Sequence, residues 1–411
     1  MKFEYFLAHL YGTKVSRREA LKLAGKAGAA GLLAYAGASR LHPGLPPVTS
    51  RPASAGSFPF EEPTDDMFDV DAVENGAWSP GPYGLGDQRG TFNEVTPEKT
   101  AEALRILANG RPVKTYNLGE LLVEGFPAFP VTPPREYKQR LFVFGYEPGP
   151  GFRENGGIVA STTPLGANRL TFHEERLSTT YQIATQLDGL NHVGVGRMYY
   201  NGHTVPEMTE PWGTSALGNE HMGPIVTRGI LLDILGLKIS QGATSALSTT
   251  GSGLRILRDN YRITLDDIRE AMRRAGIGQI RPGDVVLFRT GWTHLASLDP
   301  SRYLRSEPGI YLREARFLGN HRPAIIGSDT WGLEVVPGLH SGIAFPVHQL
   351  LFLRYGIRIG EGIRSEDLAE DGVYEFVFIW TPQYAKGATG GNTAPAALGQ
   401  PRPGRRARGT P

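Results

Sequence analysis

Short runs of apolar residues recur through the middle of this 411-residue chain and alternate with two segments of helical periodicity. The clearest run, residues 285–288, reads Val-Val-Leu-Phe and follows a Pro-Gly-Asp turn, which is typical of a buried strand. One helical segment begins at Thr96, and a second is capped by Thr264 and ends at Gly276. Further strands are expected at residues 141–144, 230–235, 324–326 and 376–380. This alternation predicts a single mixed α/β domain around one core.

The charged residues are unevenly distributed along the chain. The sequence has 43 lysines and arginines against 41 aspartates and glutamates, a formal net charge of +2. Residues 1–38 hold six basic and two acidic side chains, and the last ten residues hold four arginines, so the remainder has a net charge of −6. A nucleic-acid-binding protein is expected to have a basic face on its folded body, so we exclude nucleic acid as a partner.

The absence of cysteine excludes several kinds of site at once. Disulfides, thiolate zinc sites, iron–sulfur clusters and a cysteine nucleophile all require this residue. The sequence also has no Walker A loop, no Gly-rich dinucleotide fingerprint and no nucleophile elbow. Any bound metal ion must therefore be held by histidine, carboxylate or neutral oxygen and nitrogen donors.

The N-terminus has the features of an export signal. Arg17 and Arg18 precede a weakly apolar stretch that ends in a small-x-small pattern at Ala38. This resembles a bacterial twin-arginine signal and predicts that residues 1–38 are a Tat-type signal peptide, read by the Tat translocase, on a periplasmic or secreted protein. The stretch is too short and too rich in glycine and alanine for a stable membrane span. The alternative is an ordinary amphipathic helix with a chance arginine pair.

Composition divides the rest of the chain. Six prolines in residues 39–75 predict a linker, and arginine, glycine and proline in residues 401–411 predict a disordered tail. We therefore expect the catalytic domain to occupy residues 76–400.

The densest group of polar side chains lies in the segment from Gln182 to His192, which also contains Gln186 and Asp188. In an extended segment alternate residues share a face, so Gln186, Asp188 and His192 are expected in one site. Such side chains bind a metal ion and move a proton. A plain polar turn with a surface histidine is the alternative interpretation.

Several segments, in order along the chain, carry a resemblance to a known family. Residues 185–192, Thr-Gln-Leu-Asp-Gly-Leu-Asn-His, fit the last eight positions of the signature H-x-G-T-H-x-D-x-P-x-H. Other segments agree with the landmarks on either side of it: residues 91–97, 227–233, 282–292, 327–331, 348–351 and 386–390. The chain thereby resembles the cyclase family, metal-dependent hydrolases related to bacterial kynurenine formamidase and isatin hydrolase. The resemblance implies the swivelling β/β/α fold of that family.

The resemblance also implies roles for individual residues. Asp188, His348 and Glu361 correspond to metal ligands, and His192 to the histidine that handles protons. These three ligands would form a single divalent site, for which two carboxylates and one imidazole favour Mn²⁺ or Zn²⁺. Asp188 would also share acid/base work with His192.

Two glutamines depart from the family pattern. Gln182 and Gln186 stand where the first two signature histidines bind metal, so the chain resembles a variant subgroup with Thr-Gln-x-Asp-Gly. Gln186 would offer either a carbonyl oxygen to the metal ion or a hydrogen bond, and Gln182 would face the substrate.

The resemblance implies metal-assisted hydrolysis of a small cyclic or aryl amide, lactam or lactone. A bound divalent ion lowers the pKa of its water from 15.7 to about 7 and polarises the carbonyl group, and His192 would shuttle the proton to the leaving group. Trp331 and Trp78 are candidate walls of the substrate pocket, although core packing is the alternative for Trp78.

Two other functions stay open. A lyase, dehydratase or cyclase on the same scaffold would use Asp188 and His192 as acid and base, and the glutamines favour it because amides are weaker metal donors than imidazoles. An exported, non-catalytic binding protein for small molecules is the third possibility. Family members are commonly dimers or tetramers, so we expect a homo-oligomer.

Overall fold

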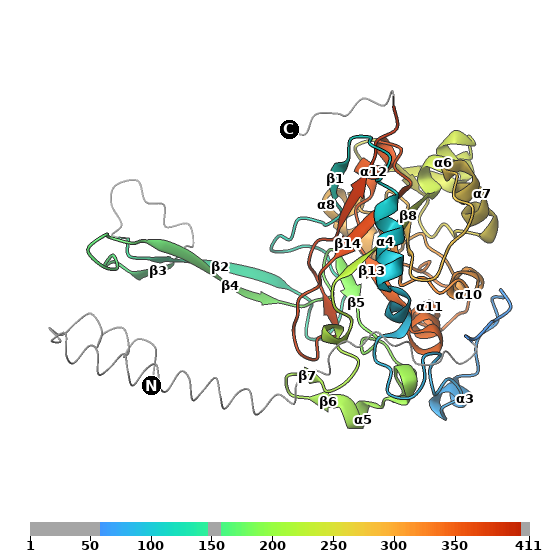
Figure 1. Ribbon diagram of the computed structural model, residues 1–411, viewed down its shortest axis with the longest axis horizontal. Coiled ribbons are helices and arrows are strands. Elements are labelled where there is room, and N and C mark those ends of the chain that lie inside the picture. The colour runs from blue at the N-terminus through green and yellow to red at the C-terminus, as the bar shows by residue number, and fades with distance from the viewer. Residues whose placement is uncertain (1–57, 147–157, 404–411) are drawn as a thin grey trace. The chain divides into compact units, whose positions relative to one another are not determined.

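The computed structural model describes residues 58–146 and 158–403 (Figure 1). The expected signal peptide, the first part of the expected linker and most of the expected tail lie outside these residues. Within the described residues, none of the helices has the length and apolar character needed to cross a membrane.

A nine-stranded sheet forms the centre of the protein, with the strand order β1-β16-β14-β8-β11-β12-β13-β5-β15. Its middle strands β8, β11, β12 and β13 are parallel, and the strands on both sides of them are antiparallel. This mixed sheet with surrounding helices confirms the predicted α/β class. Its strands are β1 (Lys114–Asn117), β5 (Gln186–Asp188), β8 (Ile225–Asp233), β11 (Val285–Arg289), β12 (Ile325–Ser328), β13 (Arg358–Glu361), β14 (Glu375–Trp380), β15 (Gly390–Gly391) and β16 (Ala396–Gly399).

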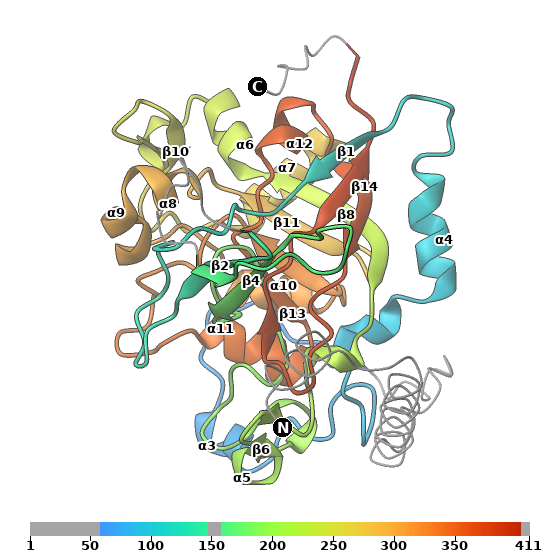
Figure 2. The ribbon, with the colours of Figure 1, turned by 90° about the vertical axis from the view of Figure 1, so that its left-hand side faces the viewer.

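The parallel strands are buried on both faces, which explains why they read as unbroken apolar runs in the sequence. In β11, residues 285–288 are all buried, as are residues 325–328 of β12. Figure 2 shows β8, β11 and β14 in the middle of the body, with α4 beside β8 and β14. The strands therefore form the rigid frame from which the side chains of the site project.

The two predicted helices begin and end where their caps require. The hydroxyl of Thr264 accepts a hydrogen bond from the backbone N–H of Asp267, the Asp267 carboxylate accepts one from the backbone N–H of Thr264, and Gly276 ends α7 with a left-handed φ of 77°. Thr96 caps α4 in the same way, through the N–H of Lys99. The helices are α3 (Val70–Glu74), α4 (Pro97–Arg105), α5 (Val205–Met208), α6 (Ile234–Ser240), α7 (Leu265–Ala275), α8 (His294–Leu298), α9 (Pro300–Arg305), α10 (Leu312–Gly319), α11 (Pro346–Gln349) and α12 (Glu366–Glu370).

Several single turns complete the structure. In the described part of the chain, four are 3₁₀ turns: η1 (Gly90–Glu94), η2 (Tyr200–Gly202), η3 (Asn219–His221) and η4 (Thr244–Ala246). The fifth, η5 (Leu350–Tyr355), is a π-helical turn that continues directly from α11. Such turns are rare and often lie next to functional sites.

Within residues 58–146 and 158–403, three small sheets lie outside the central one. β2 (Tyr137–Phe144), β3 (Ile158–Ser161) and β4 (Phe172–Thr179) form one of them, and most of its side chains are exposed, including Leu141 and Leu177. The other two are the pairs β6 (Thr209–Glu210) with β7 (Gly213–Thr214) and β9 (Leu247–Thr249) with β10 (Arg255–Leu257). We call the β2-β3-β4 sheet the arm.

The described part of the segment expected to be a linker, residues 58–75, is bound to the domain by ion pairs. The Glu61 carboxylate receives hydrogen bonds from Arg316 and Arg354, at 3.0 and 2.8 Å. Asp65 pairs with Arg262 at 2.8 Å. The folded body therefore begins before residue 76, because these acidic residues complete a network on α10 and its neighbours.

Candidate metal centre and substrate cavity

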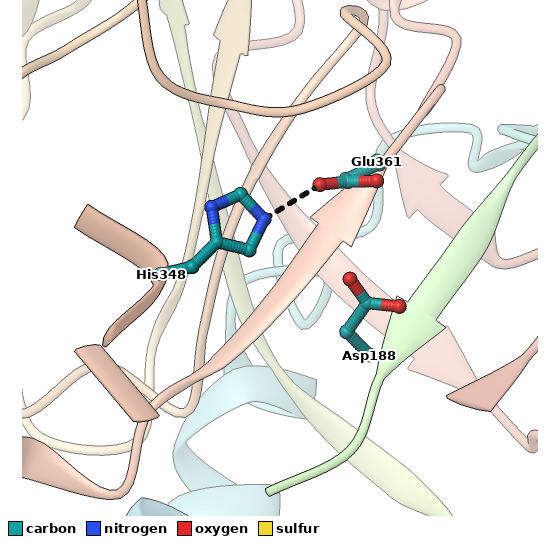
Figure 3. Close-up of side chains that lie close together, drawn as sticks. All are labelled: Asp188, His348 and Glu361. Atoms are coloured by element: carbon teal, nitrogen blue, oxygen red, sulfur yellow. Dashed lines mark hydrogen bonds and ion pairs between the residues drawn. The ribbon is translucent and has the colours of Figure 1, made fainter. Parts of the chain in front are cut away.

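Three buried side chains meet at the carboxyl end of β13. Asp188 comes from the end of β5, His348 from α11 and Glu361 from the end of β13 (Figure 3). One potential ligand atom from each lies within 4.8 Å of the other two. The structure thus brings together the three residues for which the sequence implied metal ligation.

Strand pairing places two of these side chains and Gln186 on one face. Glu361 of β13 is directly opposite Gln186 of β5, and Asp188 lies two residues further along β5, so all three point to the same side of the sheet. The side-chain amide of Gln186 donates a hydrogen bond to Oε2 of Glu361. Gln186 therefore holds the Glu361 carboxylate through its N–H, which is the second of the two roles considered from the sequence.

His348 is oriented by a carboxylate behind it. Its Nδ1 lies 2.7 Å from Oε1 of Glu334, and Glu334 also accepts hydrogen bonds from the backbone N–H groups of Val347 and His348. Nε2 of His348 faces Oε1 of Glu361 at 3.0 Å. A carboxylate that accepts a hydrogen bond from one ring nitrogen and leaves the other nitrogen for an ion is the usual support of a metal-binding histidine.

Burial and hydrogen bonding shift the pKa values of these groups in opposite ways. Burial raises the pKa of Asp188 to about 6, and the nearby Glu361 carboxylate adds to the rise. Burial alone would lower the pKa of His348, but its hydrogen bonds to Glu334 and Glu361 raise that pKa to about 10. In this form of the protein, the His348 imidazolium supplies the positive charge that the cluster of carboxylates requires.

The donor set fits a divalent cation. Oδ1 of Asp188 is buried and has no hydrogen-bond partner among the described residues, and a buried carboxylate oxygen without a partner is costly. A cation held by Asp188, His348 and Glu361 would satisfy this oxygen. Three protein ligands are the number that hold a catalytic zinc ion, and carboxylate and imidazole groups are ligands of both zinc and manganese.

His192 lies beside this group at the wall of a cavity. Its Nε2 is 3.8 Å from Oδ2 of Asp188, and its side chain is 21% exposed. Burial lowers the pKa of His192, although the Asp188 carboxylate opposes this shift. The imidazole is therefore neutral around pH 7 and able to accept a proton at the cavity surface.

The cavity has a volume of about 220 Å³ and joins a polar floor to an aromatic wall. Asp188, His192, His348 and Glu361 form the floor. The wall consists of Phe129, Trp331 and Phe345, with Arg135 next to them. Such a combination of apolar walls and a few convergent polar groups is typical of a small-molecule site.

The aromatic wall is held firmly. Phe129 stacks on Trp331 at a ring-centroid distance of 5.3 Å, and Phe345 meets the Phe129 ring edge-on at 5.4 Å. The Trp331 indole N–H donates to the carbonyl oxygen of Tyr303, and its backbone N–H donates to Glu307. Phe345 has a left-handed φ of 48°, which is strained for a bulky residue and sets its ring against both the cavity and His348.

The other residues proposed from the sequence lie elsewhere. The Gln182 amide donates to the hydroxyl of Thr389 at 3.2 Å, beside β15, and Gln182 does not line the cavity. Trp78 packs against Phe68 at 4.8 Å and contacts the main core, in line with the packing alternative. Trp331 is the tryptophan that lines the cavity.

Four residues of this region were not singled out from the sequence: Glu334, Phe129, Arg135 and Phe345. Glu334 is 14 positions from His348 and reaches it only through the path of the loop before α11. Phe129 and Arg135 come from the segment before β2, which shows neither helical nor strand periodicity. Only Glu334 had a partial signal, as an acidic residue between apolar neighbours.

Comparison with known proteins identifies the family. Residues 116–335, just over half of the chain, match the family described as “Putative cyclase”, and the chain belongs to this cyclase family. A crystal structure described as a novel cyclase is 28% identical, covers 81% of this chain and 99% of its own, and superposes with a TM-score of 0.63. No match was found among the curated proteins.

More distant structures include two isatin hydrolases. Isatin hydrolase A from Ralstonia solanacearum is 16% identical over 74% of this chain and 98% of its own, with a TM-score of 0.48. Isatin hydrolase A from Labrenzia aggregata, bound to benzyl benzoate, is 18% identical over 73% of this chain and 98% of its own, also with a TM-score of 0.48.

Proposed function

We propose that this protein is a metal-dependent hydrolase that cleaves a carbon–nitrogen or ester bond in a small cyclic or aryl amide, lactam or lactone. The observation that carries the proposal is the buried group of Asp188, His348 and Glu361, with their ligand atoms within 4.8 Å of one another. Its position on the floor of a cavity with aromatic walls supports a small organic substrate rather than a purely structural ion.

The three ligands would hold one Mn²⁺ or Zn²⁺ ion. Such an ion polarises a carbonyl group and makes water a stronger nucleophile at neutral pH. Gln186 and Glu334 keep the Glu361 carboxylate and the His348 ring in place, so the ligands need little rearrangement.

The protein's own residues supply the remaining steps. The aromatic wall binds the flat part of the substrate and keeps bulk water from it. His192 is neutral at pH 7, accepts a proton at Nε2 and passes it to the leaving nitrogen or oxygen. Asp188, 3.8 Å away, stabilises the imidazolium while it carries the proton.

A lyase or cyclase reaction is the second candidate, and one observation favours it. Gln186 occupies the position of a ligand histidine and uses its amide to bind Glu361, so the candidate centre contains one imidazole. In that reaction Asp188 and His192 would act as base and acid without adding water to the product.

Metal content and oxygen incorporation test these alternatives. We would purify the protein without a metal-binding tag, measure Mn and Zn by elemental analysis, and compare it with Asp188→Ala. About one ion per chain in the wild type and its loss in the variant would support the hydrolase. A folded protein that stays metal-free with added Mn²⁺ or Zn²⁺ would contradict it.

Turnover in ¹⁸O water then separates hydrolysis from elimination. Hydrolysis puts one solvent oxygen into the acid product, whereas a lyase or cyclase leaves the product unlabelled. His192→Ala is the companion variant, because it should keep the ion and lose turnover.

We also propose that the protein is exported by the twin-arginine route and acts in the periplasm or outside the cell. The arginine pair Arg17-Arg18 and the small residues ending at Ala38 support this proposal. Arg17→Lys with Arg18→Lys should retain the protein in the cytoplasm in a fractionation experiment, while an unchanged distribution would exclude this route.

A further inference from the structure

A single arginine stands in the wall of the cavity. Arg135 is partly buried, lies just before β2 and lines the cavity together with the candidate ligands and His192. Its guanidinium lies over the Phe129 ring, 5.7 Å from the ring centroid. Among the cavity-lining residues that the structure describes, it is the lone arginine or lysine.

Arg135 has no hydrogen bond or ion pair with any residue in the described part of the chain. Arginines of similar or greater burial elsewhere each have at least one ion-pair or hydrogen-bond partner. Arg289 pairs with Asp233, Arg316 pairs with Glu61, and Arg358 donates to the backbone carbonyl of Arg89. Because a guanidinium has five N–H donors, one that faces a cavity without an acceptor is suited to an acceptor that arrives with the ligand.

The charges on the cavity floor do not account for this arginine once an ion is bound. The Asp188 carboxylate attracts Arg135 through space, but neither Asp188 nor Glu361 accepts a hydrogen bond from it. A divalent cation would offset these two carboxylates. The positive charge of Arg135 would then be unmatched in the cavity, and an anionic group on the ligand would match it.

The aromatic wall limits what carries that anionic group. Phe129 contacts both Arg135 and Trp331, and Phe345 lies next to His348. A flat ring fits along this wall, and a volume of about 220 Å³ is below the usual range of about 300–1,000 Å³ for drug-sized ligands. The cavity is therefore suited to a ligand with one ring.

We infer that the substrate is a single-ring aryl compound with a carboxylate, which Arg135 binds while the bond to be cleaved faces Asp188, His348 and Glu361. The reaction part of this inference rests on the proposed hydrolase function, but the recognition of an aryl carboxylate does not. A planar carboxylate accepts two parallel N–H bonds from a guanidinium, so Arg135 fixes the orientation of the ring as well as its charge.

Two unreactive ligands of equal shape test the inference. Benzoate and nitrobenzene are both flat single rings, but only benzoate is charged. We would titrate each into the metal-loaded protein by calorimetry or by NMR line broadening. Any attraction between the ion and benzoate is common to the wild type and to an Arg135 variant. The ratio of their dissociation constants for benzoate therefore measures the contribution of the arginine alone.

We expect the wild type to bind benzoate more tightly than nitrobenzene. Arg135→Gln should weaken benzoate binding about 10- to 100-fold and change nitrobenzene binding by less than about 3-fold. Arg135→Lys should retain part of the preference, because it keeps the charge and loses the paired donors. Arg140→Gln is the matched control, since Arg140 lies nearby on the arm but pairs with Glu124.

Two results would overturn the inference. One is equal benzoate affinity in the wild type and Arg135→Gln. The other is an equal loss of affinity for both ligands in Arg135→Gln at an unchanged unfolding temperature. Arg135 would then contribute to the shape of the wall and would not recognise the charge of the ligand.

A failure of the hydrolase proposal would be visible separately. A protein that binds the ion but leaves its product unlabelled in ¹⁸O water would still show the Arg135-dependent preference for benzoate if the recognition is correct. If hydrolysis is established, Arg135→Gln should raise KM for a carboxylate-bearing substrate and leave KM for its neutral analogue unchanged.

Discussion

The charge state of His348 depends on two carboxylates on opposite sides of its ring. Glu334 at Nδ1 and Glu361 at Nε2 raise its pKa to about 10, so the metal-free protein carries the imidazolium at neutral pH. A metal ion can bind Nε2 only after this proton leaves. Binding of the ion and loss of the proton are therefore one event.

Proton release should accompany metal binding at pH 6. His348 would lose one proton and Asp188, whose pKa is about 6, would lose part of a second, giving between about one and two protons per ion. Calorimetric titration with Zn²⁺ in two buffers of different ionisation enthalpy measures this number. Glu334→Gln should release fewer protons and bind the ion about 10- to 100-fold more weakly. Equal heats in both buffers would contradict the protonated His348.

Asp188 should make the metal-free protein less stable as the pH rises. Its pKa is about 6 in the folded chain against 3.8 as the ordinary value, so between these values the folded state keeps a proton that the unfolded state loses. The stability that depends on this proton is complete below about pH 4 and lost above about pH 6. A shift of this size corresponds to roughly 3 kcal/mol.

Urea unfolding of the metal-free protein at pH 4, 5, 6 and 7 measures this effect. The difference in free energy between Asp188→Asn and the wild type should grow with pH in favour of the variant. Asp266→Asn, at a side chain that is 95% exposed, is the control and should show no such trend. Added Zn²⁺ should reverse the order, because only the wild type binds it well.

The same residues show how much of the site could be predicted from the sequence. The spacing of Asp188 and His192 already put them in one site, the resemblance added His348 and Glu361, and the structure brings all four to one cavity. Glu334 could not be found in this way, since its role depends on the loop that carries it back to α11. Gln186 was visible, but the choice between its two roles required the pairing of β5 with β13.

At the scale of elements, local signals worked best where a cap or an apolar run decides the structure. Thr264, Asp267 and Gly276 fix α7 within a few residues, and β11 follows its turn directly. In residues 58–75, by contrast, the local signal did not indicate the structure. Their prolines predict a linker, but ion pairs to distant arginines hold them on the domain, and no local pattern encodes such pairs.

Removing this segment should therefore destabilise the domain. A chain that starts at residue 70 leaves Arg316 and Arg354 without Glu61, and the Arg316 side chain is only 7% exposed. Leaving a buried charge without its partner costs about 3 kcal/mol. Denaturant unfolding should give a lower midpoint for this chain than for one that starts at residue 58. Equal midpoints would show that residues 58–69 contribute nothing to stability.

At the scale of the whole molecule, the stability of the arm is not explained by the contacts within a single chain. Its three strands form a separate sheet, and small sheets of this kind need a covered apolar face to be stable in water. Leu177 is 60% exposed, and Leu141, which the strand register puts on the same face, is 36% exposed. We expect a second copy of the chain to cover these side chains, in line with the homo-oligomer expected from the family.

Light scattering coupled to size-exclusion chromatography tests this expectation. The wild type should have the mass of a dimer or a larger assembly, and Leu177→Lys with Leu141→Glu should shift the mass toward 44.7 kDa, because charged side chains resist burial at an apolar interface. Leu85→Glu changes a leucine that is 86% exposed outside the arm and should leave the mass unchanged. A wild-type mass equal to that of one chain would exclude the oligomer. An unchanged mass in the arm variant would show that the interface does not involve Leu177 and Leu141. The segment from Phe129 to Arg135 lines the cavity and leads directly into β2. Loss of the interface should therefore also weaken benzoate binding, which links assembly to the shape of the cavity.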